Sequence, residues 1–110
     1  MPYYLLQVTY TPEAWAAQLK NPQDPRERIR PLVEGAGVRV EALYYAFGDY
    51  DVIALVEAPD NVSVAALSLA VTASGALTAV KTTPLMTVEE GMAAMRKGAT
   101  ASPGYRPPGA

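Results

Sequence analysis

Two hydrophobic periodicities alternate along the chain and predict four strands and four helices. A half-buried strand repeats apolar residues at every second position, whereas an amphipathic helix repeats them every three to four positions. Segments rich in aromatic and β-branched residues, bounded by Gly, Pro, Asn or Asp, predict strands at residues 3–10, 38–47, 51–58 and 77–86. Capping residues followed by helical spacing predict helices at about residues 12–19, 25–36, 62–74 and 88–97.

The order of these elements predicts a ferredoxin-like α+β domain. Asn21-Pro22 divides the first helical region, so the order is strand, helices, two strands, helix, strand and an additional C-terminal helix. Two crossovers around a hairpin give an antiparallel sheet in the order 4-1-3-2 with the helices on one face. Pro84 indicates that the last strand lies at an edge. We expect this domain at residues 1–97 and a flexible Gly/Pro-rich tail at 98–110.

The strands are apolar at odd and even positions alike. In the third strand, Val52, Ala54 and Val56 alternate with Ile53 and Leu55. One layer of helices covers only one face, and leaving six to eight apolar side chains wet on the other would forfeit on the order of 10 kcal/mol. The pattern therefore predicts a homodimer or higher homo-oligomer. The other strands show the same pattern. In the first strand, one face of the sheet is expected to carry Tyr4, Leu6 and Val8, and the other face Tyr3 and Leu5. In the second strand, one face is expected to carry Val38, Val40 and Tyr44, and the other face Leu43, Tyr45 and Phe47.

Each later helix has an apolar stripe that predicts its buried face. The stripe of the second helix consists of Ile29, Leu32, Val33 and Ala36, although Pro31 is expected to bend this helix. Met92 and Met95, with Val88 and Ala99, are expected in the core. The third helix is expected to approach the sheet closely through Val62, Ala65, Ala66, Leu69, Ala70 and Ala73.

Composition excludes several functional classes. The 110 residues include no cysteine and no histidine, so disulfides, thiolate nucleophiles, Ser-His triads and His- or Cys-ligated metals are not available, and no cofactor or metal is expected. The formal charge of -2 and the scattered basic residues argue against a nucleic-acid partner. The run Arg26-Glu27-Arg28-Ile29-Arg30 predicts a solvated helix face. Without a signal peptide or a membrane-length apolar stretch, we expect a cytoplasmic protein with no membrane contact.

A short motif lies at the predicted hairpin between the second and third strands. Phe47-Gly48-Asp49-Tyr50-Asp51-Val52 resembles the Gly-x-Tyr-Asp stretch of the GYD-domain family. The resemblance extends to about Arg96 and includes Tyr10-Thr11-Pro12, Gly35-Ala36-Gly37-Val38, Val56-Glu57-Ala58-Pro59-Asp60 and Ser74-Gly75. It implies a dimeric α+β barrel, in agreement with the sheet pattern, and it implies no particular reaction. Trp15 and Pro31 depart from the family pattern, which predicts a locally reshaped pocket.

The candidate ligand-binding residues are Tyr10, Tyr44, Tyr50 and Asp51, and no catalytic residue is assigned. In one interpretation, tyrosine hydroxyls and the Asp51 carboxylate line a cavity between the sheet and the helices. In the other, Gly48 forms a tight turn, Asp51 accepts turn amide bonds and the tyrosines only pack. Glu57 and Lys81 are either charges that protect a sheet edge or pocket groups.

Three functional hypotheses follow. The first is a small-molecule-binding, regulatory homo-oligomeric domain, favoured by the apolar, tyrosine-lined sheet. The second is a cofactor-independent oxygenase or isomerase that acts on an activated aromatic substrate, with Asp51, Tyr10 and Tyr50 as the polar contacts. The third is a purely structural or assembly role, which predicts no cavity large enough for a ligand. A cavity with converging polar groups distinguishes the first two from the third.

Overall fold

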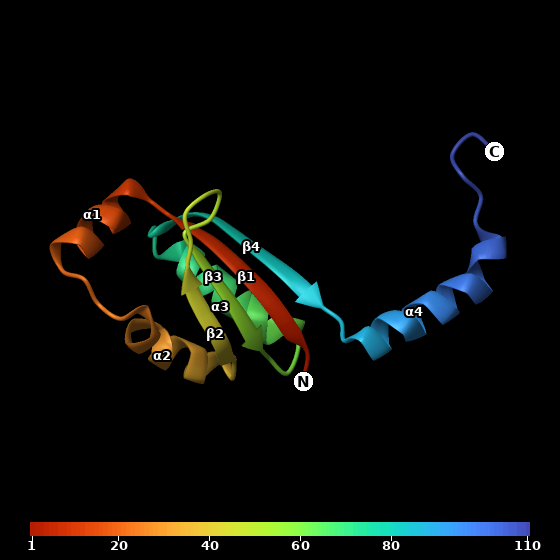
Figure 1. Cartoon of the computed structure of the whole chain (residues 1–110), viewed down its shortest axis with the longest axis horizontal. Helices are drawn as coiled ribbons and strands as arrows, with labels where there is room; N and C mark the ends of the chain where they lie inside the picture. Colours follow the sequence, from red (N-terminus) through yellow and green to blue (C-terminus); the bar gives the residue numbers. More distant parts are fainter.

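A four-stranded antiparallel sheet carries two helices on one face (Figure 1). The structure is a computed structural model that describes residues 1–110. The strand order is β2-β3-β1-β4, which places β4 and β2 at the two edges. The elements are β1 (Tyr3–Tyr10), α1 (Pro12–Lys20), α2 (Pro25–Ala36), β2 (Arg39–Tyr45), β3 (Val52–Glu57), α3 (Asn61–Ala73), β4 (Leu77–Leu85), α4 (Val88–Ala101) and a 3-10 turn at Ser102–Gly104.

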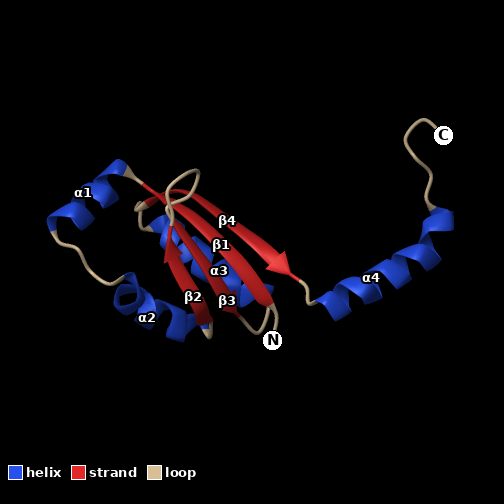
Figure 2. Cartoon of the chain, viewed as in Figure 1, coloured by secondary structure: helices blue, strands red, loops and turns tan.

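This topology confirms the ferredoxin-like α+β fold. The first crossover runs from β1 through α1 and α2 to β2, and the second runs from β3 through α3 to β4, as Figure 2 shows. The β2–β3 hairpin lies between the two crossovers in the sequence. Pro84 lies in the edge strand β4, where a residue without an N–H costs the sheet little. The fold that the hydrophobic periodicity predicts is therefore the fold of the protein.

Side-chain capping starts the helices where the sequence predicts. The Thr11 hydroxyl accepts the N–H of Ala14, and the carboxylates of Asp24 and Asp60 accept N–H groups at the starts of α2 and α3. Thr87 and Glu90 form a reciprocal capping box at the start of α4. Each cap satisfies N–H groups that have no partner inside the helix, which defines the boundary.

The core lies between the sheet and the two helices α2 and α3. Val33 is buried, and the rest of the predicted α2 stripe packs against the core, which confirms that face of the helix. Tyr4 and Val56 are almost fully buried in the two central strands. The Tyr4 hydroxyl donates a 2.6 Å hydrogen bond to Asn61 Oδ1 at the start of α3. This bond anchors α3 to β1 at one end of the sheet.

Helix α3 buries the face opposite to the predicted one. Val64 and Leu67 are its buried residues, and Ser68 Oγ lies 3.0 Å from Thr82 Oγ1 of β4. The predicted stripe faces solvent, including Val62 and Leu69. The reason is that α3 contains no charged residue and has apolar side chains on all sides, so the pattern does not single out one face. The side chains expected at the sheet but found exposed or only partly buried are Val62, Ala65, Ala66, Leu69, Ala70 and Ala73.

A bulge in β2 changes which of its side chains face the helices. The pairing with β3 shifts register between Val40 and Ala42, so one extra residue enters β2. Val40, Leu43 and Tyr45 lie opposite the helix-facing residues of β3, whereas Tyr44 lies opposite Ile53 on the other face. The sequence predicts Val40 and Tyr44 on one face of the sheet and Leu43 and Tyr45 on the other. This prediction is wrong because the bulge reverses the alternation after Val40.

The sheet face away from the helices, here called the open face, carries a patch of apolar side chains. The register pairs Leu5 with Leu55 and Leu55 with Ala42 across its centre. Gln7, Lys81 and the Arg39–Glu57 pair interrupt or border the patch. The open face is therefore apolar but less continuously so than the sequence alone predicts. The apolar members are Tyr3, Leu5, Ala42, Tyr44, Ile53, Leu55 and Leu85.

Helix α4 extends away from the sheet (Figure 1). Its apolar stripe is exposed in the single chain, with Met92 49% and Met95 72% accessible, so the prediction that these methionines belong to the core is wrong for this chain alone. The helix also continues to Ala101, beyond the predicted end near Lys97. The projection gives a radius of gyration of 17.8 Å, compared with about 13 Å for a compact chain of this length.

Candidate functional site

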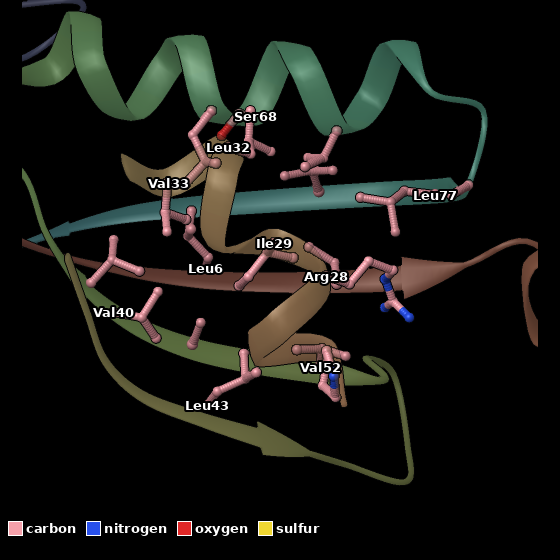
Figure 3. A pocket seen from close by; sticks show the side chains of 18 of the residues that line it. Leu6, Arg28, Ile29, Leu32, Val33, Val40, Leu43, Val52, Ser68 and Leu77 are labelled. Atoms are coloured by element: carbon pink, nitrogen blue, oxygen red, sulfur yellow. The ribbon is translucent and has the colours of Figure 1, made fainter. Parts of the chain in front are cut away.

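An apolar cavity lies between the sheet and helices α2 and α3 (Figure 3). Its volume is about 200 Å³, and 16 of its 20 lining residues are hydrophobic. The floor comes from the helix-facing side chains of all four strands, such as Leu6, Leu43, Ala54 and Val80, and Ile29 belongs to the α2 wall. The cavity exists because valines and alanines line the sheet beneath two helices that do not fill the space between them. Its size and lining suit a small apolar group.

Four lining residues carry polar side-chain atoms: Tyr10, Arg28, Ser68 and Ser74. The Ser68 hydroxyl lies 3.0 Å from Thr82 Oγ1, and the Ser74 hydroxyl donates to the carbonyl of Val71 at 2.6 Å. Both serine hydroxyls therefore have partners within the protein. Tyr10 and Arg28 are the lining residues whose polar atoms remain for a ligand.

Arg28 and Tyr10 come together at the end of β1. Figure 3 shows Arg28 reaching from α2 toward this end of the strand. Its Nη2 donates a 3.0 Å hydrogen bond to the Tyr10 hydroxyl. Burial raises the pKa of Tyr10 above its ordinary value, which outweighs the opposite effect of the neighbouring Arg28 cation. The phenol therefore stays protonated near neutral pH. Arg28 is exposed while it lines the cavity, so the pair marks an opening to solvent.

Asp51 connects the hairpin to β1 and α1. Its Oδ2 accepts the backbone N–H of Tyr10 at 2.9 Å and the indole N–H of Trp15 at 3.1 Å. Its own N–H donates to the carbonyl of Val8, and its carbonyl accepts from Ala46. The Trp15 ring packs edge-to-face on Tyr10, with centroids 5.3 Å apart. Asp51 thus holds Tyr10 and α1 in place beside the cavity and is not itself a lining residue.

The sequence profile of the GYD domain matches residues 4–95, which includes every strand, helices α1 to α3 and half of α4. The chain belongs to the GYD-domain family. Asp51, the aspartate of the Gly48-Asp49-Tyr50-Asp51 stretch, joins the hairpin to β1 and α1 in this GYD domain.

Two of the proteins that resemble this GYD domain are a bacterial relative and a domain of known structure. A protein of Thermus thermophilus, named glutamine synthetase and cystathionine beta-lyase binding protein, is 34% identical over 77 residues, which are 70% of this chain and 81% of that protein. The C-terminal domain of the MgtC protein from Mycobacterium tuberculosis has a similar structure in solution. The TM-score is 0.53 at 13% identity, over 77% of this chain and 88% of that one. The second likeness shows the fold alone.

The four predicted ligand-binding residues do not form one cluster in the GYD domain. Tyr10 lines the cavity, and Asp51 lies behind it as the acceptor for its N–H. Tyr44 is on the open face of the sheet and is 68% exposed. Tyr50 is half-buried in the hairpin, whose Gly48 has a φ of 152°, a conformation that favours glycine. The β2 bulge separates Tyr44 from the others, because it turns that side chain to the opposite face.

Sequence reasoning missed Arg28 and the role of Trp15. The run that contains Arg28 predicts a solvated helix face, and Arg26 and Arg30 follow that prediction in exposed salt bridges with Asp24 and Glu27. Arg28 lies next to Ile29 and one turn before Leu32, at the border of the buried stripe. Arg30 also adjoins Ile29 and yet lies outside the cavity, so the sequence carried no signal that singled out Arg28.

Glu57 lies outside the cavity, in a charged cluster on the open face. Arg39 donates to Glu57 Oε2 at 2.6 Å and also contacts Glu41. Hydrogen bonds, first from Arg39 and then from Tyr3, lower the pKa of Glu57 below its ordinary value. Lys81 is exposed on the edge strand β4. Neither Glu57 nor Lys81 lines the cavity.

Two further properties of the GYD domain concern metals and membranes. No three side chains of His, Cys, Asp or Glu gather in an arrangement suited to a metal ion. None of the helices combines the length and hydropathy that a membrane crossing requires.

Proposed function

We propose that this GYD domain binds a small molecule as a regulatory, homo-oligomeric domain. The observation that supports this function most directly is the cavity of about 200 Å³ beneath α2 and α3, which is lined mainly by apolar side chains and has Arg28 and Tyr10 as its polar groups without a complete set of partners. An engineered cavity of about 150 Å³ holds benzene, so this space accepts a body of about one ring. An apolar interior with a few polar groups at its opening is the usual form of a small-molecule site.

Asp51 has a positioning role in this proposal. Its Oδ2 already accepts two N–H groups, and one of them fixes the backbone of Tyr10 at the cavity rim. As the base of a cofactor-independent enzyme, Asp51 would have to contact the substrate, but this residue does not line the cavity. Binding therefore agrees with the geometry better than catalysis by Asp51.

The homo-oligomer follows from the open face. A second copy that packs its own open face on this one would cover the Leu5–Leu55–Ala42 centre of the patch. Each apolar side chain removed from water contributes roughly 1.5–3 kcal/mol when fully buried. The Arg39–Glu57 pair would then lie at the rim, where charges remain solvated. This arrangement is the dimeric α+β barrel that the sequence predicts.

The binding proposal is tested by filling the cavity. Ala54 is buried on β3 and lines the cavity, so Ala54→Leu adds side-chain volume inside it. A thermal-shift and NMR screen of small aromatic and branched aliphatic compounds should give ligands of the native protein that Ala54→Leu no longer binds. Ala66→Leu, on the exposed face of α3, is the matched control and should bind normally. Binding that survives a filled cavity in a folded Ala54→Leu protein would contradict the proposal.

A protein-binding adaptor is the second candidate. The Thermus relative is named for binding two enzymes, and the exposed stripe of α4 offers an apolar helix face of the kind that docks into a groove. We would measure the binding of purified glutamine synthetase and cystathionine β-lyase to the full chain. Met92→Lys/Met95→Lys should abolish binding to either enzyme. Ala94→Lys/Ala101→Lys, which adds two charges on the opposite side of α4, should preserve it. Equal binding by both variants would exclude α4 as the docking surface.

A further inference from the structure

The rim of the cavity contains a positive charge without an acidic partner. Four arginines lie in the sheet and in helices α1 to α3. Three of them, Arg26, Arg30 and Arg39, form salt bridges with carboxylates. Arg28 forms none, and its side chain bonds only to the Tyr10 hydroxyl. Arg28 is also the only charged residue that lines the cavity. The arginine that faces the cavity is thus the one whose guanidinium is still free to bind an anion.

Tyr10 adds a second donor at the same place. Its hydroxyl oxygen accepts the bond from Arg28, so the phenolic proton remains available for another acceptor. The ordinary pKa of a tyrosine is already far above 7 and burial raises it further, so the proton is on the oxygen at neutral pH. Asp51 fixes the Tyr10 backbone, and the Trp15 ring packs in a T-shaped arrangement with the Tyr10 ring. Two donors with a defined orientation therefore lie side by side where an apolar cavity opens.

We infer that the cavity binds a small monocarboxylic acid with an aromatic or branched aliphatic body, and that Arg28 and the Tyr10 hydroxyl hold its carboxylate. A guanidinium presents a planar fork of N–H donors that matches the two oxygens of a carboxylate. The mainly apolar lining of about 200 Å³ takes the body, and the two serine hydroxyls in it already have partners within the protein. A phosphate ester would carry a second negative charge that no other cation of the lining could pair.

This inference rests on the proposed function and specifies its ligand. The probes are phenylacetate and 4-methylpentanoate, each paired with its neutral amide, which has nearly the same shape. We would titrate the full-length protein with each probe and follow NMR chemical shifts up to concentrations well above about 1 mM, because small ligands with few contacts bind weakly. The acids should bind at least about tenfold more tightly than the amides, a ratio that one charge-assisted hydrogen bond supplies.

Arg28→Gln is the decisive variant. Arg28 is exposed, so the substitution should not affect folding, which circular dichroism would verify. It should remove the preference for the acids while leaving weak binding of the amides. Arg30→Gln, two residues along on α2, makes the same change of charge outside the cavity and should leave the preference intact. Tyr10→Phe keeps the ring and should weaken the acids more than the amides, because a hydroxyl donates a stronger hydrogen bond to a carboxylate than to an amide carbonyl.

The outcomes separate the two proposals. If acids and amides bind native protein equally, the cavity binds small molecules and the inferred carboxylate recognition is wrong. If the acids are preferred but Arg28→Gln retains that preference, the anion site lies elsewhere and the inference is again wrong. If neither series binds and the Ala54→Leu comparison also finds no ligand, the proposed function fails together with the inference.

Discussion

The indole N–H of Trp15 donates a 3.1 Å hydrogen bond to the carboxylate of Asp51, which lies 36 residues further along the chain. The same oxygen accepts the N–H of Tyr10, so one carboxylate connects α1, the end of β1 and the start of β3. The resemblance predicts that Trp15 departs from the family pattern, and this bond gives the residue a physical role. The tryptophan uses the motif aspartate as an acceptor and packs against Tyr10 at the cavity rim.

Replacing Asp51 should destabilise the protein. Asp51→Ala leaves two N–H groups without their acceptor in a half-buried site, a loss of about 1–3 kcal/mol in the free energy of unfolding. Urea denaturation measures this change, and Trp15, the single tryptophan, reports the transition by fluorescence. Asp49→Ala, two residues earlier and exposed, is the control and should change stability little. Equal effects of the two substitutions would show that the carboxylate bonds contribute nothing specific.

The capping box of α4 should determine the helicity of that segment. Helix α4 has no buried residue, so local interactions carry its stability in the single chain. Thr87→Ala removes the side-chain acceptor for the N–H of Glu90 and should cost about 1 kcal/mol of helix stability. The expected result is a loss of helical signal in far-UV circular dichroism, while the core between the sheet and helices α2 and α3 stays unchanged. Thr100→Ala, near the end of α4, should lose less helical signal. An unchanged spectrum for Thr87→Ala would mean that packing, as in an oligomer, stabilises α4 instead.

Local signals were sufficient for the elements and their order. The positions of the four strands, the four capped helix starts and the buried stripe of α2 follow from short-range chemistry that the sequence displays directly, although the predicted strand 38–47 is longer than β2 (Arg39–Tyr45). The local signals failed where the structure depends on contacts between elements that are distant in the sequence. Helix α3 is apolar all round, so only its contact with the sheet selects Val64 and Leu67 over Val62 and Leu69. The β2 bulge depends on pairing with β3, which no alternation within β2 reveals.

The candidate site was only partly predictable, because some of its contacts join residues that are distant in the sequence. Tyr10 and Asp51 are both among the candidate ligand-binding residues that the sequence predicts, and the structure joins them through the Tyr10 N–H. Arg28 required knowledge of how α2 lies over β1, because its partner Tyr10 is 18 residues away. A charged residue at the border of an apolar stripe has the same sequence pattern whether it faces water or a cavity.

Acid should weaken the open-face cluster. Hydrogen bonds, first from Arg39, lower the pKa of Glu57 from its ordinary value of 4.5. A depressed pKa in the folded state adds stability above the unfolded-state pKa, and this contribution disappears as the pH falls through the folded-state pKa. Glu57→Gln should therefore lower the melting temperature at neutral pH, and the difference from the native protein should shrink below pH 4.5.

The control for this pH dependence is Glu34→Gln, because Glu34 is exposed on α2 and forms no salt bridge. Its melting temperature should follow that of the native protein in parallel across the same pH range. A Glu57→Gln difference that stays constant from neutral to acidic pH would show that packing, and not the charge pair with Arg39, explains the effect.

Charge on the open face should separate the proposed dimer into monomers. Leu55 lies at the centre of the apolar patch, between Leu5 and Ala42, so Leu55→Arg would bury an unpaired cation in a face-to-face dimer. Light scattering should change from the mass of a dimer to the monomer mass of 11.7 kDa. Leu69→Arg, on the exposed face of α3 and equal in chemistry, should leave the dimer intact. Because a lone sheet exposes Leu55 to water, the variant should remain folded as a monomer. A dimer that tolerates Leu55→Arg but not Leu69→Arg would assign association to α3. A native protein that is already monomeric would contradict the proposed dimer and leave the open face to another partner.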